Sequence, residues 1–276
     1  MKIRVGFQGH NGTFSEIAAL EYFRGKDIEQ TGFRNFREIL HAVEAGELDY
    51  AMIPVENTTT GIISRTYDLL KDYEVKAVGE IDIPIHEDLI VIPGTKLEEI
   101  REVYSHPEAL SQCSGFFEAH PDIKSVPFQD TARSVEYVRE TGDRSKAALG
   151  SWRAREYYGM ESLLERVQDL KTNVTRFLVI APAAHPYPED ADKISMMMVL
   201  NHRPGALYNI LGILAKNGVN VLKLESRPIA GAMFEYLFYI DFEGNIRSRA
   251  IAAMIHEMEL RCLRTRILGC YKRAEI

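Results

Sequence analysis

The side chains of this chain that could do chemistry are hydroxyls, amides and one arginine, and they follow or open short apolar runs. Asn57-Thr58-Thr59-Thr60 comes after the run that ends at Val55. Four consecutive hydrogen-bonding side chains exceed what one helix cap needs, which favours a ligand site over a solvated loop. Arg176 precedes a second apolar run. An arginine there is costly unless it pairs with an anion, either a carboxylate of the protein or a substrate carboxylate held by a bidentate fork.

Residues 9–16 join the first apolar run to a helix pattern. Thr13 and Glu16 stand at capping-box spacing, which predicts an ordinary helix start in which side chains satisfy free N–H groups. The same glycine-rich turn could cradle a carboxylate at the helix N-terminus. Its spacing matches neither a P-loop nor the dinucleotide fingerprint, which disfavours phosphate and NAD.

Two more helix starts carry polar side chains. Ser105 is placed to cap a helix that a proline two residues later opens, and Gln112 lies about two turns further along. His106 is predicted to be structural rather than a general base. Thr131 follows Asp130 at another such start, where a cap is again the plain interpretation.

The motifs of the common catalytic schemes do not occur. The sequence has no GxSxG elbow, HExxH motif or cysteine cluster, so we expect no metal and no cofactor. Its three cysteines lack CxxC spacing and predict buried thiols in a reducing cytoplasm. A cleft of hydroxyls and amides suits a reaction that is already downhill and needs only orientation and one proton.

Length and composition exclude several classes of protein. A chain of 276 residues predicts two domains, or one large domain and a small one. Its net charge of −7 disfavours a nucleic-acid partner. The longest apolar runs are far short of the roughly 18 residues of a membrane span. A strand pattern that begins at Ile3 leaves no room for a signal or transit segment, so we expect a cytoplasmic protein.

Strand and helix patterns alternate up to residue 180. The expected strands are 3–8, 50–54, 103–104, 147–149 and 177–180, and the expected helices are 13–22, 61–71 and 107–119. This alternation predicts an α/β sheet with helices on both faces, which binds ligands beyond the carboxyl ends of its strands. A proline-rich linker follows at 181–192. Beyond it we expect a ferredoxin-like βαββαβ unit with strands 194–201, 219–227, 233–243 and 262–270 and helices 205–217 and 247–258.

In this order the motifs resemble the prephenate dehydratase family along nearly the whole chain. The matching segments are 12–16, 54–58 with Gly61, 105–107 with 112–113, 147–151, 173–177, 205–207 and 225–228. The resemblance implies a catalytic domain over 1–182 with a two-lobed, periplasmic-binding-protein type II-like α/β fold. Lobe 1 takes about 1–80 plus 172–182, and lobe 2 about 83–165. It also implies an ACT regulatory domain over 193–276.

The resemblance implies a reaction as well. Prephenate loses CO2 and its ring hydroxyl to give phenylpyruvate, and aromatisation drives the step without a metal or redox cofactor. Thr175 is placed at the hydroxyl as a hydrogen-bond donor, and the identity of the proton donor stays open. Arg176 or the helix start at 12–15 would hold a carboxylate. The implied substrate-binding residues are Thr13, Ser15, Glu56, Asn57, Thr58, Ser105, Gln112, Thr131, Arg176 and Phe177.

The C-terminal motifs imply an allosteric site for L-phenylalanine at a subunit interface of a homodimer or tetramer. The implied residues are Gly205, Ala206 and Leu207 of one subunit and Glu225, Ser226, Arg227 and Pro228 of another. The number of subunits, the sign and strength of the response and an effect of tyrosine stay open.

Three alternatives remain at this stage. Arogenate dehydratase is the closest, because the two substrates differ only in a keto versus an amino group, and the expected lack of a transit segment favours prephenate. A non-catalytic ligand-binding regulator is the alternative from another class, and a secreted solute-binding protein is weaker. Some family members carry an N-terminal helical chorismate mutase, which the strand at Ile3 predicts to be absent.

Overall fold

The computed structural model describes residues 2–229 and 236–274 and shows a mixed α/β chain with two sheets. This confirms the expected fold class. The chain forms two compact units. Unit 1 comprises residues 1–39, 52–63 and 82–177, and unit 2 comprises residues 40–51, 64–81 and 178–276. The predicted domain boundary between 182 and 193 therefore remains a prediction.

Four strands at one end of the first sheet position the N-terminal motifs. They lie in the order β11 (Val174–Pro182), β3 (Tyr50–Asn57), β1 (Ile3–Gln8) and β2 (Ile28–Phe33). β1 and β2 are parallel, and α1 (Phe14–Tyr22) lies between them in the chain, with α2 (Phe36–Glu44) after β2. β4 (Gly61–Ile62) pairs back onto the end of β3. Val5 and Phe7 are fully buried and anchor β1 in the core.

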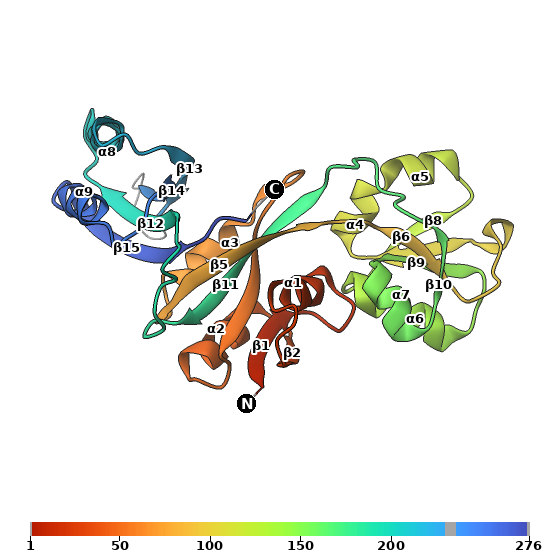
Figure 1. Ribbon diagram of the computed structural model, residues 1–276. Helices are drawn as coiled ribbons and strands as arrows, with labels where there is room; N and C mark the ends of the chain where they lie inside the picture. The colour runs from red at the N-terminus through yellow and green to blue at the C-terminus, as the bar shows by residue number, and fades with distance from the viewer. Residues whose placement is uncertain (1, 230–235, 275–276) are drawn as a thin grey trace. The chain divides into compact units, whose positions relative to one another are not determined.

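The second sheet lies in unit 1 and has helices on both faces. Its order is β10 (Glu161–Leu164), β6 (Asp88–Val91), β9 (Lys146–Gly150), β7 (Glu102–Ser105) and β8 (Lys124–Pro127). The helical segments are η1 (Leu97–Glu99), α4 (Pro107–Gln112), α5 (Ser114–Ala119), α6 (Thr131–Thr141) and α7 (Trp152–Tyr158). Figure 1 shows α4 and α5 on one face of this sheet and α6 and α7 on the other. Leu89 packs with the α4–α5 side, whereas Ile90 packs with α6 and α7, as strand alternation requires.

Unit 2 contains the expected βαββαβ order. Its elements are β12 (Lys193–Leu200), α8 (Ala206–Lys216), β13 (Val221–Pro228), β14 (Tyr236–Glu243), α9 (Arg249–Glu259) and β15 (Cys262–Tyr271), preceded by α3 (Ser64–Leu70) and β5 (Val75–Pro84). Residues 233–235, expected to open β14, lie outside the described residues. The strand order is β13-β14-β12-β15-β5, with Gly269 opposite Ala77. A Cβ at Gly269 would lie 2.6 Å from that of Ala77, so this pairing needs glycine.

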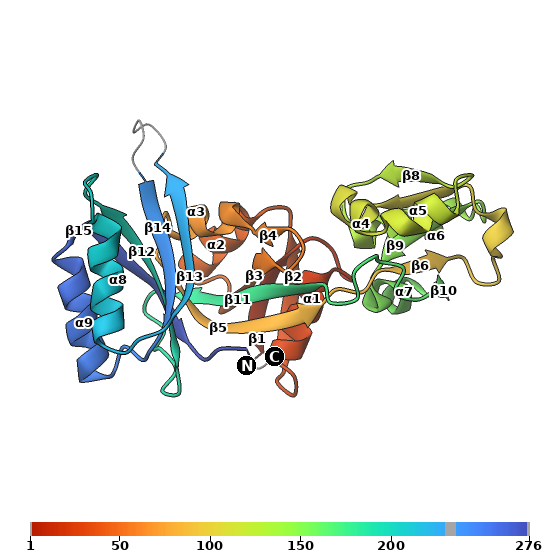
Figure 2. The same ribbon diagram turned by 90° about the horizontal axis from the view of Figure 1, so that it is seen from above.

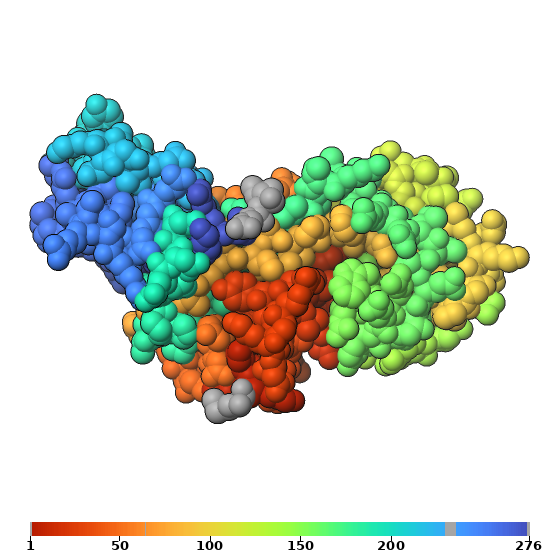
Figure 3. Space-filling model, viewed as in Figure 1, coloured from red at the N-terminus to blue at the C-terminus, as the bar shows by residue number. Residues whose placement is uncertain are grey.

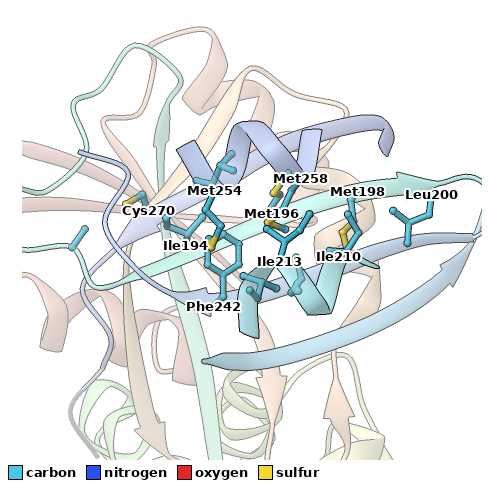
Figure 4. Close-up of a cluster of buried hydrophobic side chains, with 14 residues drawn as sticks. Ile194, Met196, Met198, Leu200, Ile210, Ile213, Phe242, Met254, Met258 and Cys270 are labelled. Atoms are coloured by element: carbon cyan, nitrogen blue, oxygen red, sulfur yellow. The ribbon is translucent and has the colours of Figure 1, made fainter. Parts of the chain in front are cut away.

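α8 and α9 cover one face of the sheet formed by β12 to β15 (Figure 2). Alternate residues of β12 point toward them. Ile194, Met196 and Met198 are fully buried and pack against Ile210 of α8 and Met258 of α9 (Figure 4). On the edge strand β13, the side chains of Leu222 and Leu224 are partly exposed.

Two expected boundaries are wrong. The helix expected over 61–71 begins at Ser64, because residues 61–62 pair with Glu56 and Asn57 as β4. The helix expected over 107–119 is broken at Cys113 into α4 and α5. The Asp169 carboxylate accepts the backbone N–H groups of Ser114, at 3.0 Å, and of Gly115, at 2.9 Å, and so caps a new helix there.

Candidate active site

A cavity of about 1050 Å³ lies in unit 1, and segments that follow strands form much of its wall. The turns after β1 and β2, the end of β3, the start of α4 after β7, and the start of α6 after β8 contribute residues. The crossover from β5 to β6 adds Ile85 and Glu87. The carboxyl ends of strands therefore meet here, where α/β sheets bind ligands.

About half of the expected substrate-site residues line this cavity. They are Thr13, Ser15, Asn57, Gln112, Thr131 and Thr175. Glu56, Thr58, Ser105, Arg176 and Phe177 do not line it in the described structure. Both strands are longer than the sequence predicted. β3 continues to Asn57 instead of ending at residue 54, and β11 begins at Val174 instead of at residue 177. Because neighbouring strand residues face opposite sides, residues next to Asn57 and Thr175 point away from the cavity.

A chain of amide hydrogen bonds positions the Thr175 hydroxyl. Asn57 Nδ2 donates to Thr175 Oγ1 at 2.9 Å and to Asn173 Oδ1 at 2.7 Å. Asn173 Nδ2 donates to Gln112 Oε1 at 2.8 Å, and Gln112 Nε2 donates to Thr59 Oγ1 at 3.2 Å. Asn57 Oδ1 accepts the Thr59 N–H at 2.9 Å. Since Thr175 Oγ1 accepts a hydrogen bond from Asn57, its own proton can point to a ligand in the cavity.

The sequence left open whether Arg176 pairs with a carboxylate of the protein or of a substrate. In the structure it pairs with carboxylates of the protein. Its Nε and Nη2 donate to the two carboxylate oxygens of Asp82, both at 2.8 Å, and its Nη1 lies 3.6 Å from Glu56 Oε2. This bidentate pair joins β11 to β5 on the side away from Thr175. A role of Arg176 in holding a substrate carboxylate therefore rests on the resemblance alone.

The turn between β1 and α1 does not form the expected capping box, because Glu16 accepts the N–H of Gly12 and the Thr13 N–H donates to the His10 carbonyl at 3.2 Å. The Gly12 N–H donates to Glu16 Oε2 at 2.5 Å, whereas Thr13 Oγ1 is buried and has no hydrogen-bond partner among residues 2–229 and 236–274. A Cβ at Gly12 would lie 2.7 Å from Ala154 Cα, and Ser151 Oγ donates to the Gly12 carbonyl at 2.6 Å. Figure 3 shows this red N-terminal stretch beside the green stretch that contains α7. The Thr13 hydroxyl at the start of α1 thus remains available to an anion.

His10 is a cavity residue that the sequence patterns did not single out. Its Nδ1 lies 2.7 Å from Asp130 Oδ2, and Asp130 also caps α6 by accepting the Arg133 N–H at 2.7 Å. Arg34, an exposed residue after β2, lines the cavity as well. A histidine inside a glycine-rich turn is a signal that could have been used, but only the fold places it beside the start of α6.

The expected cap of α4 is wrong. Ser105 is fully buried, and its hydroxyl donates to the Leu149 carbonyl at 2.8 Å instead of to the helix. His106 is the N-cap, because its Nδ1 accepts the Glu108 N–H at 3.2 Å. The structural role expected for His106 fits this contact, although the residue also lines the cavity.

Glu87 differs from the other carboxylates at the cavity. Its side chain is almost completely buried, and burial, followed by the negative charge of Asp88, raises its pKa to about 8. Burial, followed by the charges of Glu87 and Asp169, also raises the pKa of the Cys113 thiol well above its usual range. Cys113 is therefore an inert core thiol rather than a nucleophile.

The described residues contain no cluster of three or more His, Cys, Asp or Glu side chains that could hold a metal ion. In the same described part of the chain, no helix is long and apolar enough to cross a membrane.

Fold and cavity together define an α/β protein with a polar ligand site at the ends of its strands. The family model of prephenate dehydratase matches residues 5–185, and the chain belongs to this family.

Of three similar proteins, two carry the activity of this family in their names and the third is described differently. Arogenate dehydratase/prephenate dehydratase 1 of Arabidopsis thaliana is 37% identical over 98% of this chain and 72% of its own. The structure of prephenate dehydratase from Arthrobacter aurescens in complex with L-Phe is 32% identical, with a TM-score of 0.88 over 98% of this chain and 90% of its own. GqqA, described as a novel type of quorum quenching acylase, is 31% identical with a TM-score of 0.88 over 98% of both chains.

Proposed function

We propose that this chain is a prephenate dehydratase that converts prephenate to phenylpyruvate in phenylalanine biosynthesis and is feedback-regulated by L-phenylalanine. The observation that carries the proposal is the hydrogen bond from Asn57 Nδ2 to Thr175 Oγ1 at the cavity. It leaves the threonine proton free to meet the hydroxyl that departs from the substrate ring. Family membership independently points to the same reaction.

The protein is needed mainly to orient the substrate for this reaction. The bond from the ring to its carboxylate breaks, and the released electron pair enters the ring while the hydroxyl on the opposite ring carbon leaves. Hydroxide is a poor leaving group, so a hydrogen bond or proton at that oxygen lowers the barrier. Thr175 holds this oxygen in the proposal. The unpartnered Thr13 hydroxyl and the α1 helix start receive a substrate carboxylate, and Arg34 adds positive charge at the rim.

We expect purified protein to convert prephenate to phenylpyruvate without any added cofactor. Absorbance of phenylpyruvate measures the rate, and the rate should survive dialysis against EDTA because the proposed site uses only protein side chains. Arogenate is assayed in parallel, since one relative is named for both substrates. Turnover of arogenate with none of prephenate would overturn the choice of substrate, and turnover of neither would overturn the proposal.

Acylase activity, which is described for GqqA, is a weaker candidate for the function of this cavity. Acyl transfer by a hydroxyl needs that hydroxyl bonded to a base. In the part of the chain that the structure describes, the His10 ring bonds Asp130 and no hydroxyl. The proposal also places the protein in the cytoplasm as a homodimer or tetramer, without nucleic-acid or membrane partners. Gel filtration with light scattering would measure the number of subunits.

The regulatory proposal assigns residues 193–276 to an ACT domain with an L-phenylalanine site. A small pocket of about 170 Å³ in unit 2 supports it, because Ala206 and Leu207 at the start of α8 line this pocket together with Arg203 and Phe238. Residues 225–228 do not line the pocket within this chain, and the proposal takes them from a second subunit. Arg227 Nη2 donates to Asp68 Oδ2 at 3.0 Å, and this bond raises the pKa of the Arg227 guanidinium.

The substitution Ala206→Leu should weaken phenylalanine binding about tenfold, which corresponds to about 1.4 kcal/mol, because the larger side chain occupies space in the pocket. Isothermal titration of the full chain measures this change, and the inhibition curve should shift in parallel. Ala252→Leu, at an exposed position of α9, is the matched control. Equal affinity of Ala206→Leu and the unmodified protein would place the effector site elsewhere.

A further inference from the structure

The crossover between β5 and β6 holds Glu87 at the cavity by backbone hydrogen bonds on both sides. The Glu87 N–H donates to Gln168 Oε1 at 3.1 Å, and the Val167 N–H donates to the Glu87 carbonyl at 2.8 Å. Two residues earlier, the Ile85 N–H donates to the Asn173 carbonyl at 2.8 Å. Residues 85–87 therefore lie beside residues 167–173. Asn173 in the latter segment belongs to the hydrogen-bond network that positions Thr175.

One oxygen of the Glu87 carboxyl lacks the hydrogen-bond partner that an ionised carboxylate needs. The residue is 2% exposed, and its Oε2 is buried with no hydrogen-bond partner anywhere in residues 2–229 and 236–274. A buried anion without partners is costly, so the neutral acid is the favoured form. The ionisable groups next to it in the chain are His86 and Asp88, and its charge acts on Cys113 between α4 and α5. Arg166 and Asp169 flank the two residues that bond the Glu87 backbone, and His106 and Glu108 at the start of α4 line the same cavity.

The other carboxylates that line the cavity in the described structure are already engaged. Glu108 Oε1 accepts from Gln112 Nε2 at 3.2 Å, Asp130 pairs with His10, and Glu136 pairs with Arg133. Each of these carboxylates therefore has a polar or charged side chain as a direct partner. Glu87 differs from these carboxylates because its surroundings favour the protonated, neutral form of its side chain.

We propose that Glu87 is the acid that protonates the departing hydroxyl of the substrate. This inference rests on the proposed function. The bond between the ring carbon and the hydroxyl oxygen breaks, and the oxygen leaves as water with the proton of Glu87. The ring gains the electron pair of the lost carboxylate, which leaves as CO2. Glu87 remains as a carboxylate and takes a proton from solvent before the next turnover, so one proton is consumed for each substrate.

Thr175 and Glu87 then have different roles. The threonine hydroxyl, held by Asn57, orients the leaving oxygen by a hydrogen bond, and its very weak acidity makes it a poor source of a full proton. The Glu87 carboxyl is acidic enough to transfer its proton and remains protonated at neutral pH, because its pKa is raised to about 8. Both residues line the same cavity.

The substitution Glu87→Gln keeps the shape of the side chain and removes the transferable proton. We expect kcat with prephenate to fall about tenfold, less than for complete loss of an acid, because the glutamine amide still donates a hydrogen bond. In the unmodified protein kcat/KM should fall as the pH rises through about 8, and this limb should be absent in Glu87→Gln. Glu98→Gln, an exposed position on η1, is the control and should keep both rate and pH profile.

The pH profile separates an acid from a structural residue. A lower rate with an unchanged alkaline limb in Glu87→Gln would overturn the inference, because the limb then belongs to another ionisable group at the cavity. An unchanged rate would overturn it as well. In both cases the unmodified protein still turns over prephenate, so the proposed function stands. Failure of the unmodified protein to turn over prephenate would instead remove the proposed function itself.

A second readout does not depend on activity. A carboxyl with a folded-state pKa raised from 4.5 to about 8 contributes stability that is fully present below pH 4.5 and is lost as the pH rises to about 8. The free energy of unfolding of Glu87→Gln relative to the unmodified protein should therefore increase across this window and level off above it. A difference that does not change with pH would show that Glu87 is ionised in the folded protein and would overturn the inference.

Discussion

Replacing Thr175 with alanine is expected to lower kcat for prephenate by about two orders of magnitude, within the range for loss of a positioned group in proton transfer. The threonine hydroxyl accepts from Asn57 Nδ2 at 2.9 Å, so its proton is free for the leaving oxygen of the substrate. Alanine removes this donor while Asn57 keeps its bond to Asn173. Steady-state kinetics with prephenate measure the change.

Thr175→Ser and Thr31→Ala are the controls for this substitution. Serine retains the hydroxyl and should recover most of the rate, whereas Thr31 is an exposed position on β2 and should be silent. Loss of one hydroxyl costs about 1 kcal/mol of stability, so circular dichroism should show a folded Thr175→Ala protein. If the folded variant retained nearly the full kcat, Thr175 would be a structural residue only.

Several polar residues of the site could be predicted from the sequence, but the side of the strand to which each side chain points could not. Asn57 and Thr175 were both singled out, and both line the cavity. The motif at 173–177 placed Arg176 beside them as a further ligand residue, and the family resemblance added Glu56. In the structure both belong to strands, where alternation turns them to the other face and pairs them with each other and with Asp82. Strand ends depend on pairing with distant segments, which a local pattern does not contain.

Long-range contacts also explain the features that the sequence did not reveal. The break after α4 comes from Asp169, a residue far along the chain that captures the N–H groups of Ser114 and Gly115. Glu87 looks like an ordinary charged residue between two strands, and only the fold shows that its carboxyl is buried, with one oxygen that has no hydrogen-bond partner in the described part of the chain. By contrast, the βαββαβ order was predictable because the alternating and helical periodicities are local.

Unit 2 combines residues 178–276 with residues 40–51 and 64–81, whereas the domain boundary expected at residues 182–193 remains a prediction. In this unit β5 and α3 pack with the C-terminal strands. Arg266 donates to the carbonyl of Lys71 at 2.7 Å, and Gly269 pairs with Ala77. A linker composition marks where the chain is irregular, but it does not show which elements pack together.

The second large effect is expected on stability, at Lys193. Its Nζ lies 2.8 Å from Glu80 Oε2 and 3.4 Å from Asp241 Oδ2, and all three residues are buried. Lys193→Met removes the cation from two buried carboxylates and should cost about 3–5 kcal/mol of the free energy of unfolding. This is a large share of the roughly 5–15 kcal/mol that stabilises a typical domain. Chemical denaturation followed by circular dichroism measures it.

A compensated variant tests whether the charges themselves cause this loss. Combining Lys193→Met with Glu80→Gln and Asp241→Asn leaves no buried charge in the group, and neutral replacements of a buried ionic cluster are often nearly neutral in stability. The triple variant should therefore be more stable than Lys193→Met alone. Lys216→Met, at an exposed position near the end of α8, is the matched control and should change stability little. If the single Lys193 substitution were as mild as this control, the buried charges would not depend on the lysine, and the ion pairs would contribute no net stability to unit 2.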